Sequence, residues 1–260
     1  MRASVILGIA LLVSAAVTAR AVEIEPNRPS NSVNAKLVPP GGVQIESGIA
    51  ISSERKAGEP RERRFEVDID LRVGVTPRLE IDISDQPFVR LRGPDDDTGH
   101  GDITLGFKYR FVEATEGEVW PPHFGVKPFV KLPTASAPIG SERPDFGLLV
   151  LATFDLPSRF SLDLNVGGVA VGQTRPNGYI GQTIVAAALS RTMRPGLSVF
   201  GEIFFNSRQE HGGRDLLGVD AGATYLLTPR LAVDLAAQTS LHGQGPDWVV
   251  RTGLSVLFGP

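Results

Sequence analysis

The chain has 260 residues, no cysteine, and a formal net charge of -3 at pH 7. The lack of cysteine excludes disulfides, thiolate metal sites and cysteine nucleophiles, and the acidic balance argues against nucleic acid as a partner. Glycine (29) and proline (20) are abundant, and no long segment repeats with a helical period, so the chain is predicted to be all-β.

The first residues have the order of a secretory signal peptide. Met1-Arg2 is followed by an apolar run from Val5 to Val17 and then by Ala19-Arg20-Ala21. We expect residues 1–21 to be removed by cleavage after Ala21. The apolar run of about 13 residues is too short to cross a bilayer as a helix, and no later run reaches the roughly 18 residues required.

Residues 22–42 lack strand alternation and contain four prolines, at positions 26, 29, 39 and 40. Two structures are compatible with this composition. The segment could lie inside a barrel as a plug, or it could be a periplasmic tail. The residues alone favour neither.

From residue 43 to residue 260 the sequence alternates with a period of two. In the clearest copy the apolar face is Phe65, Val67, Ile69, Leu71 and Val73, and the other face is Glu66, Asp68, Asp70, Arg72 and Gly74. About twelve such segments begin near Val43, Phe65, Leu79, Asp102, His123, Phe146, Phe160, Tyr179, Leu197, Leu216, Leu231 and Trp248. Lengths of about 9 to 13 residues exceed those of soluble strands and suit a tilted membrane crossing.

The connections between these segments alternate in length. Tight turns contain proline, at 76–78, 156–159, 193–196 and 228–230, and longer polar loops lie at 53–63, 92–101, 133–145, 173–178, 208–215 and 242–247. The connection at 113–122 is an exception on the short-turn side. Short periplasmic turns and longer outer loops are typical of outer-membrane barrels, whose strands must close because unpaired backbone is costly in lipid. We therefore predict one closed, antiparallel transmembrane β-barrel of about 12 strands over residues 43–260.

A soluble periplasmic β-sandwich remains an alternative, because alternation alone does not say which face meets water. Strand length and loop asymmetry favour lipid. The aromatic content of 7% is low for a protein with two aromatic girdles. Candidate girdle residues are Trp120, Phe124, Tyr225 and Phe258.

If the apolar face meets lipid, the charged side chains are expected to line the lumen. The predicted lumen residues are Asp68, Asp70, Arg72, Asp82, Lys108, Arg110, Lys127, Lys131, Asp163, Glu202, Asp220, Asp234 and Arg251. Folding about Pro77 would place Arg72 near Asp82, and folding about Asp96 would place Asp82 near Arg110. Such charges either neutralise one another across a narrow bore or select solutes along a permeation path.

No catalytic, metal or cofactor site is predicted. His100, His211 and His242 lie in outer loops, but no serine occupies a recognisable nucleophile motif, so a hydrolase at the rim is only an alternative. The run Asp95-Asp96-Asp97 lacks calcium-loop spacing, which favours a solvated loop tip. The basic run from Arg61 to Arg64 could contact lipid phosphate.

Two motifs resemble a known outer-membrane family. Residues 101–111 read GDITLGFKYRF, and residues 127–136 read KPFVKLPTAS. They resemble the transporter family of the meta-pathway of phenol degradation, although Ala135 stands where that family usually has glycine. The resemblance covers about Gly99 to the C-terminus and implies a barrel similar in architecture to long-chain fatty-acid channels. One departure is that Gly259-Pro260 follow Phe258, whereas such barrels usually end on an aromatic residue.

Taken together, the pattern and the resemblance predict a monomeric channel of the bacterial outer membrane. We expect passive uptake of small, hydrophobic or aromatic molecules, and no enzyme activity. The expected partners are the lipid bilayer, lipopolysaccharide, the barrel assembly machinery and the solute. A sealed structural barrel is the main alternative.

Overall fold

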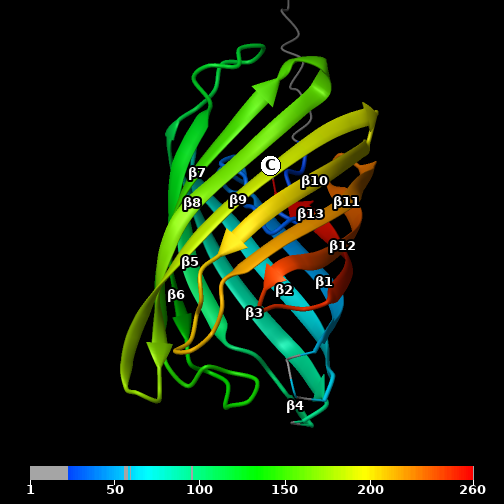
Figure 1. Cartoon of the computed structure of the whole chain (residues 1–260). Helices are drawn as coiled ribbons and strands as arrows, with labels where there is room; N and C mark the ends of the chain where they lie inside the picture. The colour runs from blue at the N-terminus through cyan, green and yellow to red at the C-terminus, as the bar shows by residue number, and fades with distance from the viewer. Residues whose placement is uncertain (1–22, 56–57, 59, 95, 260) are drawn as a thin grey trace, which may run out of the picture.

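The computed structural model describes residues 23–55, 58, 60–94 and 96–259, which form a barrel of long antiparallel strands (Figure 1). The predicted signal peptide lies outside these residues. Within the described ranges, helical structure is the short 3-10 turn η1 (Pro157–Arg159), and no helix is long and apolar enough to cross a membrane. The strands are β1 (Val43–Glu54), β2 (Glu62–Thr76), β3 (Leu79–Arg92), β4 (Asp97–Gly99), β5 (Ile103–Val112), β6 (His123–Leu132), β7 (Asp145–Leu156), β8 (Phe160–Gln173), β9 (Gly178–Arg194), β10 (Leu197–Asn206), β11 (Leu216–Thr228), β12 (Leu231–Gly243) and β13 (Trp248–Phe258).

The barrel closes where the first strand meets the last. β1 pairs with β13 from Val43 opposite Phe258 to Ser53 opposite Trp248, and it pairs with β2 on its other side. Pairing of β2 with β3 completes the ring, and the short β4 adds to the outer end of β3. The prediction of a closed antiparallel barrel of about 12 strands is confirmed, with β4 as an extra strand.

The apolar faces of the strands point outward. The side chains of Ile69, Leu105 and Phe107 are 36%, 39% and 44% exposed, whereas Lys108, between Phe107 and the next outward residue, is fully buried. A soluble sandwich would bury the apolar face and expose the charges, so that alternative is wrong. This outer surface suits hydrocarbon, and the barrel has the architecture of an outer-membrane protein.

Aromatic side chains gather near both rims. Phe65 and Phe88 lie 6.0 Å apart, and Phe146 and Tyr179 lie 6.1 Å apart, toward the long loops. At the other rim, the Tyr109 and Phe111 rings are 5.0 Å apart, and Phe124 continues the row. Aromatic residues at these two levels form the interfacial girdles of a transmembrane barrel, despite the low aromatic content.

The N-terminal segment, defined as residues 23–42, lies inside the barrel (Figure 1). It begins at the short-turn rim, where the Ile24 amide donates to the Pro229 carbonyl at 2.8 Å, and returns there, where the Gly41 amide donates to Gly74 at 2.8 Å. Ile24 and Val38 pack against Ala232 and Leu257 at this rim. Its prolines do not suit a central strand, so the chain crosses the lumen as irregular backbone.

Candidate functional site: the barrel lumen

A buried ion network covers the inner wall of β1, β2, β3 and β5. The Arg72 guanidinium donates to Glu46 at 2.8 Å and to Glu80 at 2.9 Å, and its Nε lies 3.8 Å from Asp82. Lys108 Nζ lies 3.2 Å from Glu80. Arg72 and Asp82 are direct register partners, as predicted. Each buried charge in this network therefore has an opposite charge beside it, which a low-dielectric interior requires.

The predicted proximity of Asp82 to Arg110 is wrong. The register of β3 against β5 places Glu80 opposite Lys108 and Asp82 opposite Gly106. Asp82 instead contacts Lys127 at 3.3 Å, and Arg110 contacts Glu113 at 2.9 Å. β4 and β5 pair with β3 in one register, with Val89 opposite Gly99 and Asp82 opposite Gly106, so the chain folds back about Pro94 and not about Asp96.

The same charged side chains bind the backbone of the N-terminal segment. Glu46 accepts hydrogen bonds from the amides of Asn27 and Arg28, the latter at 3.0 Å, and Glu80 accepts from the Val38 amide at 2.5 Å. Arg72 donates to the Glu25 carbonyl at 2.8 Å, and Lys108 donates to the Lys36 carbonyl at 3.0 Å. Irregular backbone in a lumen must find its hydrogen bonds outside itself, and this wall supplies them.

The opposite wall holds the tip of the segment. Glu202 accepts hydrogen bonds from the amides of Asn31 at 2.8 Å and Ser32 at 2.7 Å. Asn165 exchanges two bonds with the Val33 backbone, at 2.7 and 2.8 Å. The segment is therefore bound on both sides of the barrel.

The Arg28 side chain spans the space between two predicted lumen residues. Its guanidinium contacts Asp68 and lies 3.2 Å from Asp234. A Cβ at Gly48 or at Gly253 would overlap this guanidinium, so these two residues, which are register partners, provide room for it. The space that the Arg28 guanidinium requires explains why both strands have glycine at these two paired positions.

The other predicted lumen residues also have partners inside the barrel. Asp220 accepts from the Asn31 side chain at 2.8 Å, and Arg251 donates to the Pro29 carbonyl at 3.0 Å. Asp163 accepts from the Thr153 hydroxyl at 2.5 Å. Lys131 contacts Asp145 at 2.5 Å, and Asp70 lies at the edge of an outer cavity. These contacts place the side chains, and a role in permeation remains a proposal.

Two cavities lie in the lumen at different levels. The outer cavity, of about 780 Å³, faces the long loops, and its charged lining is mostly acidic: Asp68, Asp70, Asp85, Asp102, Asp145 and Glu210, against Lys131 and Arg175. The inner cavity, of about 410 Å³, lies between the N-terminal segment and strands β7 to β11. The lumen is therefore hollow above the segment and along one side of it.

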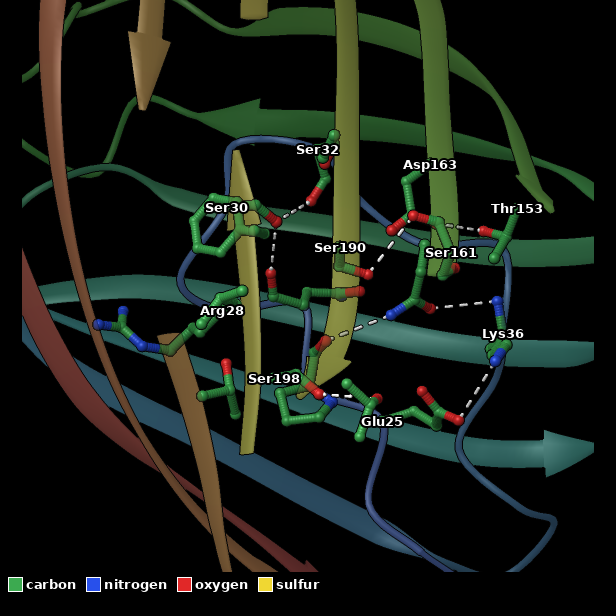
Figure 2. Close-up of a pocket in the computed structure, with 18 of the residues that line it drawn as sticks. Glu25, Arg28, Ser30, Ser32, Lys36, Thr153, Ser161, Asp163, Ser190 and Ser198 are labelled. Atoms are coloured by element: carbon green, nitrogen blue, oxygen red, sulfur yellow. Dashed lines mark hydrogen bonds and ion pairs between the residues drawn. The ribbon is translucent and has the colours of Figure 1, made fainter. Parts of the chain in front are cut away.

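The inner cavity has a polar lining (Figure 2). Ser161, Ser190 and Ser198 from the wall face the segment, whose Lys36 lies 3.5 Å from Glu25 and 3.1 Å from Asp155. Burial opposes the charge of Lys36, but the two carboxylates outweigh it and raise the pKa of this lysine. The cavity thus presents hydroxyl groups on one side and Lys36, paired with Glu25 and Asp155, on the other.

An apolar inner wall lies on β7 to β10, between the levels of the two cavities. It consists of Leu151, Val169, Ala186 and Phe204, which are 0%, 7%, 4% and 5% exposed. Along β8, Val169 lies between Asp163, which lines the inner cavity, and Val171, which lines the outer one. The prediction of lumen residues named only charged side chains and missed this wall. The sequence feature that could have indicated this wall is a continuous apolar run, such as residues 148–152, because such runs are typical of strands that are covered on both faces.

The histidines make structural contacts. His100 Nδ1 lies 3.1 Å from the Gly101 carbonyl oxygen, His211 is in a long loop that borders the outer cavity, and His242, predicted in a loop, is exposed at the end of β12. His123, at the opposite rim, accepts a hydrogen bond from the Ala114 amide at 3.2 Å and lies 3.6 Å from Asp155. Among the described residues, no group of three or more acidic or histidine side chains is placed to hold a metal ion.

Comparison with solved structures shows the same fold. An outer membrane channel from Pseudomonas putida F1 is 14% identical with a TM-score of 0.72, covering 91% of this chain and all of that one. The beta domain of the Bordetella autotransporter BrkA is 11% identical with a TM-score of 0.52, covering 84% of this chain and all of that one. The NanC porin is 9% identical with a TM-score of 0.51, covering 82% of this chain and 98% of that one. At these identities the likeness concerns the fold.

The sequence itself has one informative match. Among curated proteins, none matches it. A family model described as "Putative MetA-pathway of phenol degradation" matches residues 26–258, which includes nearly all of the N-terminal segment and every strand of the barrel. The match spans most of the chain, and the chain therefore belongs to this family.

Proposed function

We propose that this protein is an outer-membrane channel for the passive uptake of small hydrophobic or aromatic molecules. The channel-type barrel supports transport, and membership of a phenol degradation family supports an aromatic solute. We expect a monomer that reaches the outer membrane by means of residues 1–21 and the barrel assembly machinery. Catalysis has no part in this proposal.

The observation that carries the proposal is the sequence of polar and apolar regions along the inner faces of β7 to β10, from the long loops toward the short turns. From the outer rim inward, these strands present the outer cavity, then the buried side chains of Leu151, Val169 and Phe204, and then the hydroxyl-lined inner cavity, so a solute would have to displace what covers the buried side chains to pass between the cavities. Apolar side chains with a few polar groups are the usual lining of a site for small organic molecules. An aromatic ring carrying a polar group has matching contacts at each level.

The N-terminal segment lies in the lumen between the charged wall of β1, β2, β3 and β5 and the strands β7 to β10, as a plug. Its hydrogen bonds to Glu46, Glu80 and Glu202 hold it against the charged wall and the tip. Because the tip of the segment also bonds to Asn165 on β8 and to Glu202 on β10, a solute on the β7 to β10 side would have to pass beside that tip to reach the inner cavity. The alternative function, a sealed structural barrel, is favoured by the number of these bonds.

Uptake into vesicles tests the proposal. We expect the reconstituted protein to admit phenylalanine faster than glutamine, two zwitterions of equal net charge that cross lipid poorly. Replacing the apolar wall with Leu151→Asn and Phe204→Asn is expected to lower this preference roughly fivefold, because apolar contact with the ring is lost. The matched control, Val150→Asn, changes the outward neighbour of Leu151 and leaves the wall intact.

The outcomes separate the two functions. A sealed barrel would admit neither solute faster than empty vesicles. Equal rates for both solutes in the unmodified protein would show a pore without the proposed selectivity. A preference that persists in the double variant would contradict the role of the apolar wall.

A further inference from the structure

Three arginines form a patch on the outer surface of the barrel, which we call the outer arginine patch. Arg63 lies on β2, and Arg90 and Arg92 lie on β3. Arg63 is the register partner of Arg92, and Phe65 is the partner of Arg90. All three arginines are exposed, so their side chains form one cluster across two adjacent strands.

The patch lies directly above the apolar belt. On β2 the outward residues run from Val75, near the short-turn rim, to Phe65, and the next outward position is Arg63. At 3.3 Å per residue this belt is about 33 Å long along the strand, and the usual tilt reduces it to about 25 Å along the membrane normal. The neighbouring ring pair of Phe65 and Phe88 marks the interfacial level. The patch therefore lies where lipid headgroups begin.

In the part of the chain that the structure describes, the positive charge of the patch is not neutralised by ion pairs. Among the described residues, none of its three members forms an ion pair, whereas their neighbour Arg64 contacts Glu66 at 2.5 Å and Arg61 contacts Asp247 at 3.4 Å. Asp96 and Asp97, beyond the end of β3, accept hydrogen bonds from the Gly93 and Thr98 amides. The sequence had suggested lipid contact for the whole run 61–64, but only Arg63 of that run belongs to the patch.

The patch is confined to one side of the barrel. At the same rim, the outward positions of other strands carry Phe146, Tyr179 and Trp248, which are 51%, 48% and 39% exposed. These residues suit the interface but bear no charge. A localised site is therefore present rather than a uniform basic ring.

We infer that the outer arginine patch binds the phosphate groups of lipopolysaccharide in the outer leaflet. Arginine presents a planar fork of donors that matches phosphate oxygens, and three such forks can hold adjacent phosphate groups. The site lies on the outside of the wall, so it is independent of the path through the lumen. Binding at this patch would hold the side of the barrel formed by β2 and β3 against the bound lipid.

Binding of the full chain to lipid A tests this inference. The expected result is that the purified protein binds lipid A with two phosphates about tenfold more tightly than dephosphorylated lipid A. A triple variant, Arg63→Ser, Arg90→Ser and Arg92→Ser, should lose this difference. A control triple variant, Arg78→Ser, Arg159→Ser and Arg194→Ser, removes equal charge from exposed turns at the opposite rim and should retain it.

Two results would overturn the inference. One is equal binding of the two lipids by the unmodified protein, which needs no variant to fold. The other is full competition by inorganic phosphate at the concentration of the lipid, which would show that the patch binds the free anion rather than the lipid.

Discussion

Removing the N-terminal segment from the lumen is expected to raise the single-channel conductance of the reconstituted protein roughly fivefold or more, because a barrel of this strand number is narrow and the segment fills much of it. Both ends of the segment lie at the short-turn rim, so residues 24–38 can be deleted without stretching the chain. The acidic lining of the outer cavity should make the opened pore prefer cations. Planar-bilayer recording measures both properties.

A control for this deletion comes from within the segment. The Ser30 hydroxyl contacts only backbone carbonyls of Asn27 and Ser32, both in the segment itself. Ser30→Ala should therefore leave the conductance of the full chain unchanged. Unchanged conductance after the deletion would contradict the role of the segment as a plug.

Replacing Arg72 by methionine is expected to destabilise the barrel by about 3 to 5 kcal/mol, because it leaves buried carboxylates without their partner. The Arg72 side chain is 1% exposed, as Glu46 and Glu80 are fully buried beside it. The variant also loses the hydrogen bond to the Glu25 carbonyl, which helps to hold the segment. Urea unfolding, followed by the heat-modifiable mobility of the folded barrel, gives the free energy.

The matched control is Arg64→Met on the same strand. Arg64 pairs with Glu66 nearer the rim, where the two side chains are 27% and 22% exposed, and we expect a loss of less than about 1 kcal/mol. Equal losses for the two variants would show that the buried network does not carry the stability assigned to it.

Strand positions could be predicted from the sequence because the period of two is a local property. The predicted start of the second strand was Phe65 and the observed start is Glu62, whereas the predicted starts at Leu79 and Leu231 match. The short β4 was missed because three residues are too few to show alternation. Asp82 and Arg110 are apart because the chain folds back about Pro94, two residues before the predicted point, and the sequence of the loop does not fix that point.

The partners of the inward charges could not be predicted from the strands alone. Alternation indicates that Glu46 or Glu202 faces inward, but it carries no information about a segment without regular structure. The structure shows that both carboxylates accept hydrogen bonds from amides of residues 27–32. The prolines at 26 and 29 were a signal that this segment would need such external partners.

Labelling of adjacent residues on β5 tests the orientation of the strands most directly. Leu105 is on the outward face and 39% exposed, and Thr104 lines the outer cavity. Because the chain lacks cysteine, Leu105→Cys and Thr104→Cys each give a single site for a fluorescent label. In vesicles, brominated lipid should quench the label at 105 and aqueous iodide the label at 104. The reverse pattern would contradict a barrel with its charged face inside.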